Sequence, residues 1–230
     1  MWESVEKTDN YCLRVCDCGL AEYRHVLQLQ HQLREKKRQG KMPNTVLVVE
    51  HLPVITFGAR QNANKLLVSR DALRRRRIDV VHTRRGGGTT AHNPGQLVFY
   101  PILHLANLGL GISDYIRRLE AVGAELLQQL GVNAESRKGF PGLWVGDRKI
   151  ASIGVRVSKS VTFHGMAINV QNDLSIFDFI IPCGLNGMNM TSALKETGKH
   201  HSMSGAKQKL RRLLTGYFSS KGVVEHDKCA

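Results

Sequence analysis

A glycine-rich polar loop between two apolar segments constrains this chain more than any other feature. From Arg84 to Gln96 the sequence reads RRGGGTTAHNPGQ, with three consecutive glycines at 86–88. Glycine permits positive φ and lets a ligand lie against the main chain, where peptide N–H groups can bind it. The apolar residues on either side, 78–81 and 97–102, predict buried strands. A polar loop held between two core strands predicts a binding site rather than a plain irregular turn.

Two common nucleotide-binding motifs do not fit this loop. A P-loop needs Gly-Lys-Ser/Thr at the start of a helix, and a dinucleotide fingerprint needs its last glycine packed at a helix start. Here the glycines lead to Pro94 and then to an apolar strand. The sequence therefore excludes both motifs.

Length and composition suit one domain, or one domain with a small appendage, and we expect a single domain over residues 1–230. A chain of 230 residues with 42% hydrophobic residues can bury a full core. No apolar run reaches the length of a membrane span. The first ten residues carry three acidic side chains and no apolar core, which is typical of neither a secretory signal nor an Arg-rich transit peptide.

The five cysteines, without a secretory signal, indicate free thiols in a reducing compartment. Cys12, Cys16 and Cys18 share one parity on a predicted strand. This pattern suggests a metal site, but no second pair of ligands lies at zinc spacing. We therefore expect small buried hydrophobic side chains on one strand face, and no metal.

The formal net charge of +14 indicates an anionic partner, such as nucleic acid, phospholipid or an acidic protein. The basic runs 34–41 and 74–77 contribute much of this charge. Charge runs are usually solvated, and no aromatic residues alternate with them as in proteins that stack single-stranded bases. The sequence therefore disfavours nucleic acid as the partner, and no membrane is expected.

Hydrophobic periodicity predicts helices and strands in mixed order. The predicted helices span 20–38, 69–77, 113–130 with Ser113 as N-cap, and 204–218. The predicted strands lie at 11–18, 45–51, 54–60 and 162–170, together with a hairpin that turns at Gly146-Asp147. Adjacent strands, hairpin connections and grouped helices predict an α+β fold, a mostly antiparallel sheet flanked by helices.

Two residues stand out as candidates for chemistry. Lys149 follows the hairpin turn and shares strand parity with Ala151 and Ile153, so it is either exposed at the strand end or partly buried; parity alone favours exposure. Cys183 lies between a proline and a glycine in a tight turn. Such rigidity suits a presented nucleophile better than a packing residue, although the residue types alone leave both roles open.

Four stretches together resemble the octanoyl-acyl carrier protein:protein octanoyltransferases of lipoate biosynthesis. They are RGGGTTAHNPGQ (85–96), DRKIASIGVRV (147–157), HGMAINV (164–170) and IPCGLNGMNMTS (181–192), in the order of the family and across nearly the whole chain. The resemblance implies the biotin/lipoate ligase catalytic fold. Asn93 stands where the family usually has glycine. Asparagine tolerates a glycine-like backbone, so we expect the loop to keep its shape.

The resemblance also implies the site residues. Cys183 would take the acyl group as a thioester, and Lys149 would lower the pKa of that thiol. The acyl pocket would be lined by Arg85, Gly86, Gly87, Gly88, Thr89, Thr90, Ala91, His92, Ser152, Ile153, Gly154, Gly165, Met166 and Ala167. Two assignments stay open. His92 either positions the acyl carbonyl or locks the loop, and the oxyanion donors are amides of 86–88 or amides that flank Cys183.

The implied partners are proteins, and no cofactor is expected. The donor would be octanoyl-acyl carrier protein. The acceptors would be lipoyl domains of 2-oxoacid dehydrogenase acyltransferase subunits and the glycine cleavage H protein. The extra cysteines and the overall texture of the sequence favour a eukaryotic, mitochondrial protein. The expected compartment is therefore the mitochondrial matrix in a eukaryote and the cytoplasm otherwise.

Two other functions compete with this one. An ATP-dependent lipoate or biotin ligase shares the fold and a related glycine tract, but it activates a free acid and needs no nucleophilic thiol. The Pro182-Cys183-Gly184 turn favours the transferase. A basic, non-catalytic binding module would leave Cys183 without a role.

Overall fold

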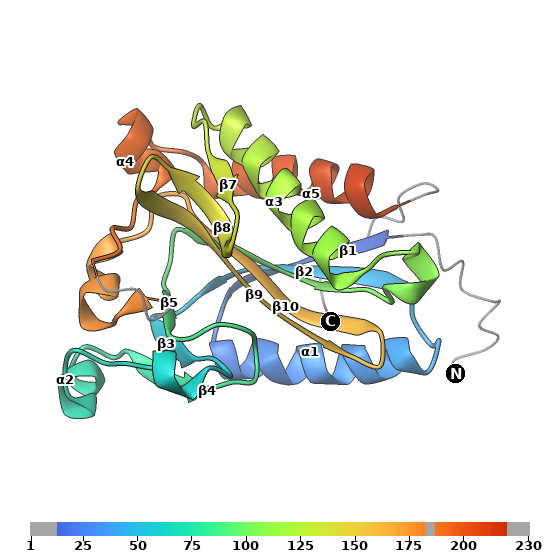
Figure 1. Cartoon of the computed structure of the whole chain (residues 1–230), viewed down its shortest axis with the longest axis horizontal. Helices are drawn as coiled ribbons and strands as arrows, with labels where there is room; N and C mark the ends of the chain where they lie inside the picture. Colours follow the sequence, from blue (N-terminus) through green and yellow to red (C-terminus); the bar gives the residue numbers. More distant parts are fainter. Residues whose placement is uncertain (1–12, 183–186, 220–230) are drawn as a thin grey trace.

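The computed structural model describes residues 13–182 and 187–219. Its centre is a seven-stranded sheet of order β1-β2-β6-β10-β9-β8-β7, in which β1 and β2 are parallel and all other neighbours are antiparallel (Figure 1). The strands are β1 (Leu13–Ala21), β2 (Asn44–His51), β6 (Gln96–Ile102), β10 (Val161–Asn169), β9 (Arg148–Ser158), β8 (Phe140–Val145) and β7 (Glu135–Arg137). The predicted, mostly antiparallel sheet is confirmed.

Helices cover both faces of this sheet, as Figure 1 shows. The longer ones are α1 (Tyr23–Arg38) on one face, and α3 (Ile112–Gln129) and α5 (Met203–Phe218) on the other. The shorter ones are α2 (Arg70–Arg75), α4 (Ala193–Thr197) and the 3-10 turns η1 (Gln61–Ala63), η2 (Ala106–Leu108) and η3 (Leu174–Phe179). Successive side chains of β6 pack to opposite faces. Leu97 and Phe99 join the core under α3 and α5, whereas Val98 and Tyr100 join the core under α1.

A second, three-stranded sheet of order β4-β3-β5 carries the glycine-rich loop. It consists of β3 (Val54–Phe57), β4 (Asp79–His82) and β5 (Thr90–His92). The prediction of a strand to residue 60 is therefore too long. The sequence also gave no sign of β5, which forms because the second half of the polar loop pairs with β3, His92 opposite Val54.

Two helix starts differ from the prediction. The strand β1 continues through Ala21, which pairs with His51, so α1 begins at Tyr23 rather than at residue 20. The N-cap of α3 is Gly111 rather than Ser113, because the side chain of Asp114 accepts the Gly111 N–H at 3.3 Å. The hairpin turn at Gly146-Asp147 is confirmed.

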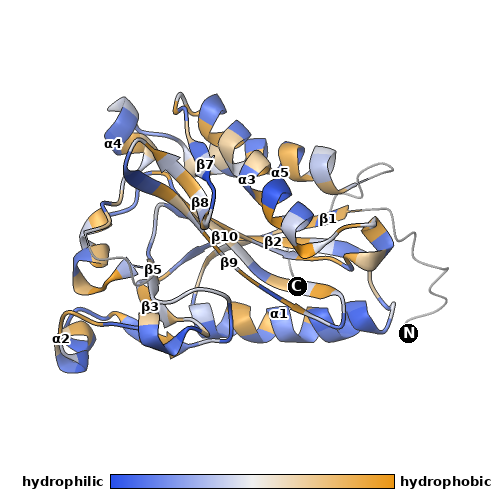
Figure 2. Cartoon of the chain, viewed as in Figure 1, coloured by the Kyte–Doolittle hydropathy of each residue, from blue (hydrophilic) through white to orange (hydrophobic). Residues whose placement is uncertain are grey.

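Polar residues gather on the surface of the fold, and two of the cysteines pack in or against its core. Figure 2 shows hydrophilic residues concentrated in the last turns of α1. Cys16 is buried in the core under α1 and Cys18 packs against that core, which confirms their packing role; Cys12 and Cys229 lie outside the described residues. Among the helices of the described segments, none combines the length and apolar character that crossing a bilayer requires.

Candidate active site

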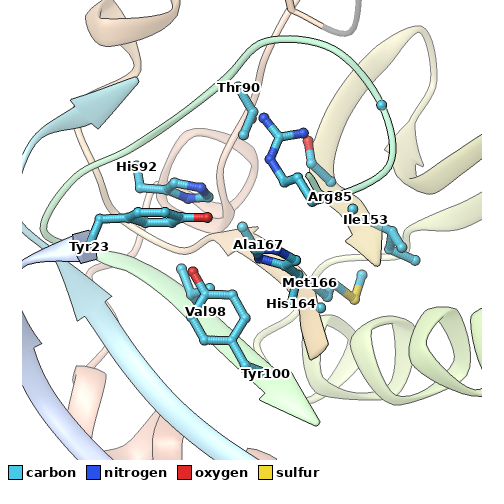
Figure 3. A pocket seen from close by; sticks show the side chains of 14 residues that line it. Tyr23, Arg85, Thr90, His92, Val98, Tyr100, Ile153, His164, Met166 and Ala167 are labelled. Atoms are coloured by element: carbon cyan, nitrogen blue, oxygen red, sulfur yellow. The ribbon is translucent and has the colours of Figure 1, made fainter. Parts of the chain in front are cut away.

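A cavity with about 440 Å³ of empty space, part of it open to solvent, lies where the glycine-rich loop meets α1, β6, β9 and β10 (Figure 3). The lining residues are Tyr23, Arg85, Gly87, Thr90, His92, Val98, Tyr100, Ser152, Ile153, Gly154, His164, Gly165, Met166 and Ala167. The fold thus brings together three of the four stretches singled out in the sequence.

Most of the predicted pocket residues line this cavity. They are Arg85, Gly87, Thr90, His92, Ser152, Ile153, Gly154, Gly165, Met166 and Ala167. The other four, Gly86, Gly88, Thr89 and Ala91, are not among the lining residues and shape the loop instead. A Cβ at Gly88 would lie 2.5 Å from the Cβ of Ala63, so only glycine fits there.

The hydrogen bonds of the loop reduce the number of candidate oxyanion donors. The Gly86 N–H donates to the Val155 carbonyl oxygen at 2.9 Å, so this amide already has a partner and is a poor oxyanion donor. Thr89 accepts the Lys65 N–H at 3.0 Å through its hydroxyl, and Ala91 is fully buried.

Four lining residues were missed by the sequence reasoning. Val98 and Tyr100 could have been found, because both lie on one face of a predicted strand. Tyr23 comes from the first turn of α1 and stacks on His92, with ring centroids 5.7 Å apart. Only tertiary packing brings Tyr23 and His164 to the cavity.

Arg85 anchors the loop from within. Its side chain is buried, with 7% of the residue exposed, and donates to both oxygens of Thr56 at 2.8 Å and to the Gly86 carbonyl at 3.1 Å. The planar guanidinium suits several acceptors at fixed angles. It joins β3 to the glycine-rich loop and brings one positive charge to the cavity wall.

His92 is held in one tautomer. Its Nδ1 lies 2.6 Å from Oε1 of Gln96, whose Nε2 donates to the Ala91 carbonyl at 3.3 Å. A carbonyl oxygen can only accept, so the amide orientation of Gln96 is set and Nδ1 of His92 must carry the proton. Nε2 of the neutral ring is then an acceptor. His92 therefore locks the loop, and this tautomer cannot donate through Nε2 to an acyl carbonyl.

The same network reaches the segment that follows Cys183. Nε2 of Gln96 also donates to Oδ1 of Asn169 at 2.8 Å, and Nδ2 of Asn169 donates to the Thr191 carbonyl at 2.9 Å. The Thr191 N–H in turn donates to the Lys149 carbonyl at 2.9 Å. A chain of buried hydrogen bonds thus links the loop, β10 and β9.

Burial keeps the imidazoles of this region neutral. It lowers the pKa of His92 to about 3 and that of His164 to about 3, with smaller contributions from neighbouring positive charges. It lowers the pKa of His51, which lies behind Tyr100, to about 4 and raises the pKa of Tyr23 to about 12. At neutral pH, Arg85 is thus the charged group of the lining, and the remainder suits an apolar ligand.

These neutral histidines should make the folded protein sensitive to acid. In the unfolded chain they titrate near 6.5, whereas in the folded protein His51, His92 and His164 resist protonation. The unfolded state therefore binds more protons, and stability falls as the pH drops below about 6.5 towards 4. The slope approaches about 1.4 kcal/mol per pH unit for each histidine. Urea unfolding at pH 7.5, 6 and 5 measures it.

His51→Gln should reduce this slope, because it removes one of the three buried imidazoles. An unfolding free energy in His51→Gln that depends on pH as steeply as in the native chain would contradict the assignment.

Lys149 is buried, with 3% of the residue exposed, so the exposure favoured by parity is wrong. Its Nζ donates to the Pro141 carbonyl at 3.0 Å and lies 5.0 Å from the centroid of the Trp144 ring. The register between β8 and β9 shifts between Leu143 and Trp144, which breaks the simple alternation on which parity depends. A further segment also covers this end of β9.

That segment follows Cys183 in the chain. Lys149 forms a bridge with Met190, and its N–H donates to the Asn189 carbonyl at 2.8 Å. Pro182 and Gly187 line one cavity together with Met190. Cys183 itself lies outside the described residues, so its distance from Lys149 stays a prediction. The structure does place Lys149 beside the chain that continues from Cys183.

Comparison with known proteins identifies the family of this chain. Residues 22–215 match the lipoyl protein ligase A/B catalytic domain family. The chain is 41% identical to an octanoyltransferase of Desulfovibrio desulfuricans over 79% of this chain and 76% of the relative. It is 37% identical to the mitochondrial octanoyltransferase LIP2 of Arabidopsis thaliana over 80% of this chain and 79% of the relative.

A solved structure shares the fold. A putative lipoate protein ligase of T. acidophilum with bound lipoic acid superposes with a TM-score of 0.69 at 16% identity, over 95% of this chain and 90% of that one. The predicted ligase-like fold is thereby confirmed. The family match and the sequence identities show that this chain belongs to the lipoyl protein ligase A/B catalytic domain family and, within it, to the octanoyltransferases, which are acyltransferase enzymes.

Proposed function

We propose that the protein moves an octanoyl group from octanoyl-acyl carrier protein to the ε-amine of a lysine on a lipoyl domain, through a thioester on Cys183. One observation carries this proposal. The cavity is lined by neutral groups except for Arg85, and buried hydrogen bonds connect it to Lys149 and to the segment after Cys183. An apolar acyl chain fits such a lining, with its reactive end towards Lys149.

The reaction consists of two acyl transfers. The Cys183 thiolate attacks the donor thioester, its sulfur–carbonyl bond forms, and the pantetheine thiolate leaves and takes up a proton. The acceptor amine then attacks the acyl-enzyme; an amide forms, the amine loses a proton, and the Cys183 thiol is released. The first step exchanges one thioester for another at nearly equal energy, so no ATP is consumed. The stable amide drives the second step, and the kinetics are ping-pong.

Lys149 is the proposed partner of Cys183. Its burial beside Trp144 and Pro141 holds the amine in one place, and its backbone pairing with Met190 ties it to the chain after Cys183. A positioned amine can stabilise a thiolate and exchange protons with the leaving thiol and the attacking amine.

The proposed acceptors are lipoyl domains of 2-oxoacid dehydrogenase acyltransferase subunits and the glycine cleavage H protein. The proposed compartment is the mitochondrial matrix in a eukaryote and the cytoplasm in a bacterium. The names of the relatives support this choice, since one is a plant mitochondrial protein and another is bacterial.

The function is tested by transfer without ATP. The protein is incubated with octanoyl-acyl carrier protein and a lipoyl domain, and intact mass spectrometry follows the acceptor. We expect a gain of one octanoyl group. An ATP-dependent ligase would instead require ATP and free octanoate, and a binding module would modify nothing in either reaction. Either of these results would overturn the proposal.

The basic surface should act in recruitment. The run 74–77 borders the segment that leads to Cys183, since the Arg76 guanidinium lies 5.3 Å from the centroid of the Phe179 ring. The run 34–41 begins in the last turns of α1 and, in Figure 1, lies at the opposite end of the lower layer from α2. Carrier proteins and lipoyl domains are commonly acidic, and they must dock near Cys183. We therefore expect the run 74–77 to contribute more to their recruitment than the run 34–41.

We therefore expect kcat/KM for the carrier protein to fall steeply between low and moderate salt while kcat barely changes. Attraction between exposed charges is screened over about 8 Å at physiological ionic strength and mainly accelerates encounter. Neutralising the exposed Arg75, Arg76 and Arg77 should lower kcat/KM more than neutralising the exposed Lys36, Arg38 and Lys41. A short octanoyl-pantetheine donor should show little salt dependence. If salt affects both donors equally, electrostatic recruitment is wrong.

A further inference from the structure

His164 has an unusual backbone for its place in the fold. It lies within β10 yet has φ of 57°, in the left-handed region that a non-glycine residue rarely adopts. Neighbouring side chains of a regular strand point to opposite faces. Here the rings of Phe163 and His164 stack instead, with centroids 4.9 Å apart and planes 30° apart. The left-handed backbone therefore turns the imidazole to the α1 side of the sheet, into the wall of the cavity.

The ring forms a firm wall together with Tyr100. Their centroids lie 6.5 Å apart in an edge-to-face contact, and Figure 3 shows both at the cavity. The His51 Nδ1–H donates to the Ala21 carbonyl at 3.1 Å, so the Tyr100 hydroxyl must donate to Nε2 of His51 at 2.8 Å. The backbone N–H of His164 donates to Oε1 of Gln30 at 2.8 Å. The Tyr100 ring is thus held by its hydroxyl, and the His164 backbone is held by α1.

The wall stands at the end away from Lys149. Along β9, Ser152 pairs with Ala167 and Val155 pairs with His164, so the Ala167 end of the cavity is nearer to Lys149. Nδ1 of His164 is buried without a hydrogen-bond partner among the described residues. The residue is 2% exposed, and its ring contributes bulk to the wall rather than a polar contact.

The part of β10 that lines the cavity is about as long as a short acyl chain. The four consecutive residues from His164 to Ala167 line it, and three steps of about 3.3 Å span about 10 Å. With carbon–carbon bonds of about 1.5 Å, an extended eight-carbon acyl group reaches about 9 Å. A chain four carbons longer would have to pass the His164 ring.

We propose that His164 is a specificity-determining residue that closes the acyl cavity and limits the transferred chain to about eight carbons. The proposal rests on the proposed function, since it assumes that the acyl group lies along β10 with its carbonyl towards Lys149. It assigns a steric role to the imidazole and none in the chemical steps.

The test compares octanoyl-, decanoyl- and dodecanoyl-pantetheine as donors to a lipoyl domain. His164→Gly removes the ring and accepts the same backbone conformation. We expect the ratio of kcat/KM for dodecanoyl over octanoyl donors to rise on the order of 10-fold or more, since each methylene excluded from an apolar pocket is worth a comparable factor. His31→Ala is the matched control. The His31 ring packs near Phe163, with ring centroids 5.6 Å apart, but His31 does not line the acyl cavity. Its ratio should equal that of the native chain.

His164→Asn provides a second variant, because asparagine tolerates the left-handed region and is smaller than histidine. It should raise the same ratio, and circular dichroism identifies the folded variants. Folded variants that transfer octanoyl groups with the native length ratio would overturn the role of His164. A native enzyme that transfers no acyl group from any thioester would instead overturn the proposed function, so the two failures are distinct.

Discussion

Replacing Cys183 with alanine should abolish octanoyl transfer and the acyl-enzyme together. Removing the nucleophile of a covalent acyl-transfer enzyme costs on the order of a millionfold in kcat. With the acceptor withheld, the native protein should gain one octanoyl group from the donor alone, because the acyl-enzyme then has no amine to which it can pass the group. The adduct should be labile to hydroxylamine, as a thioester is. Intact mass spectrometry follows it directly.

Cys18→Ala is the matched control. Cys18 is half-buried in β1, where it packs against the core under α1, so this variant should form the adduct normally. Full turnover by Cys183→Ala would refute the covalent mechanism, and an adduct retained in that variant would place the acyl group on another residue.

Replacing Lys149 should lower turnover by a factor of about 10² to 10⁴, the usual contribution of a positioned acid or base. Thiolate formation alone cannot account for so much. A thiol pKa lowered from about 8.5 to about 6.5 raises the thiolate fraction at pH 7 roughly 25-fold, but the weaker nucleophile loses about 8-fold. The net gain is about 3-fold, so a large effect means that Lys149 also moves protons.

Burial determines which variants are informative. Lys149 is 3% exposed, so alanine would leave a hole beside Trp144, whereas methionine keeps most of the volume. Both variants should lose turnover, and Lys149→Met should unfold close to the native temperature. Lys138→Ala, at an exposed position, is the control for loss of one charge.

The pH dependence separates the two roles of Lys149. Raising the pH to 9 restores the thiolate but supplies no positioned acid or base, so it should recover only part of the activity. Complete recovery at pH 9 would show that Lys149 acts only through the thiol.

The parts of this protein that could be predicted from the sequence depend on local physics. Apolar periodicity located most of the strands and helices, because burial repeats every two or 3.6 residues. The glycine-rich loop was recognisable because three adjacent glycines remove side chains from the backbone. Ten of the predicted pocket residues line one cavity because they lie on that loop and on β9 and β10, strands that pair with each other.

The remainder required the tertiary structure. The burial of Lys149 arises from a register shift and from pairing with Met190, a residue 41 positions away in the sequence. The strand β5 exists because β3 offers it an edge, and Tyr23 reaches the cavity only because α1 crosses the sheet. The direction of the His164 ring depends on one backbone angle. Periodicity describes the average alternation of a strand, whereas bulges, left-handed residues and long-range pairing are decided by contacts that no local pattern contains.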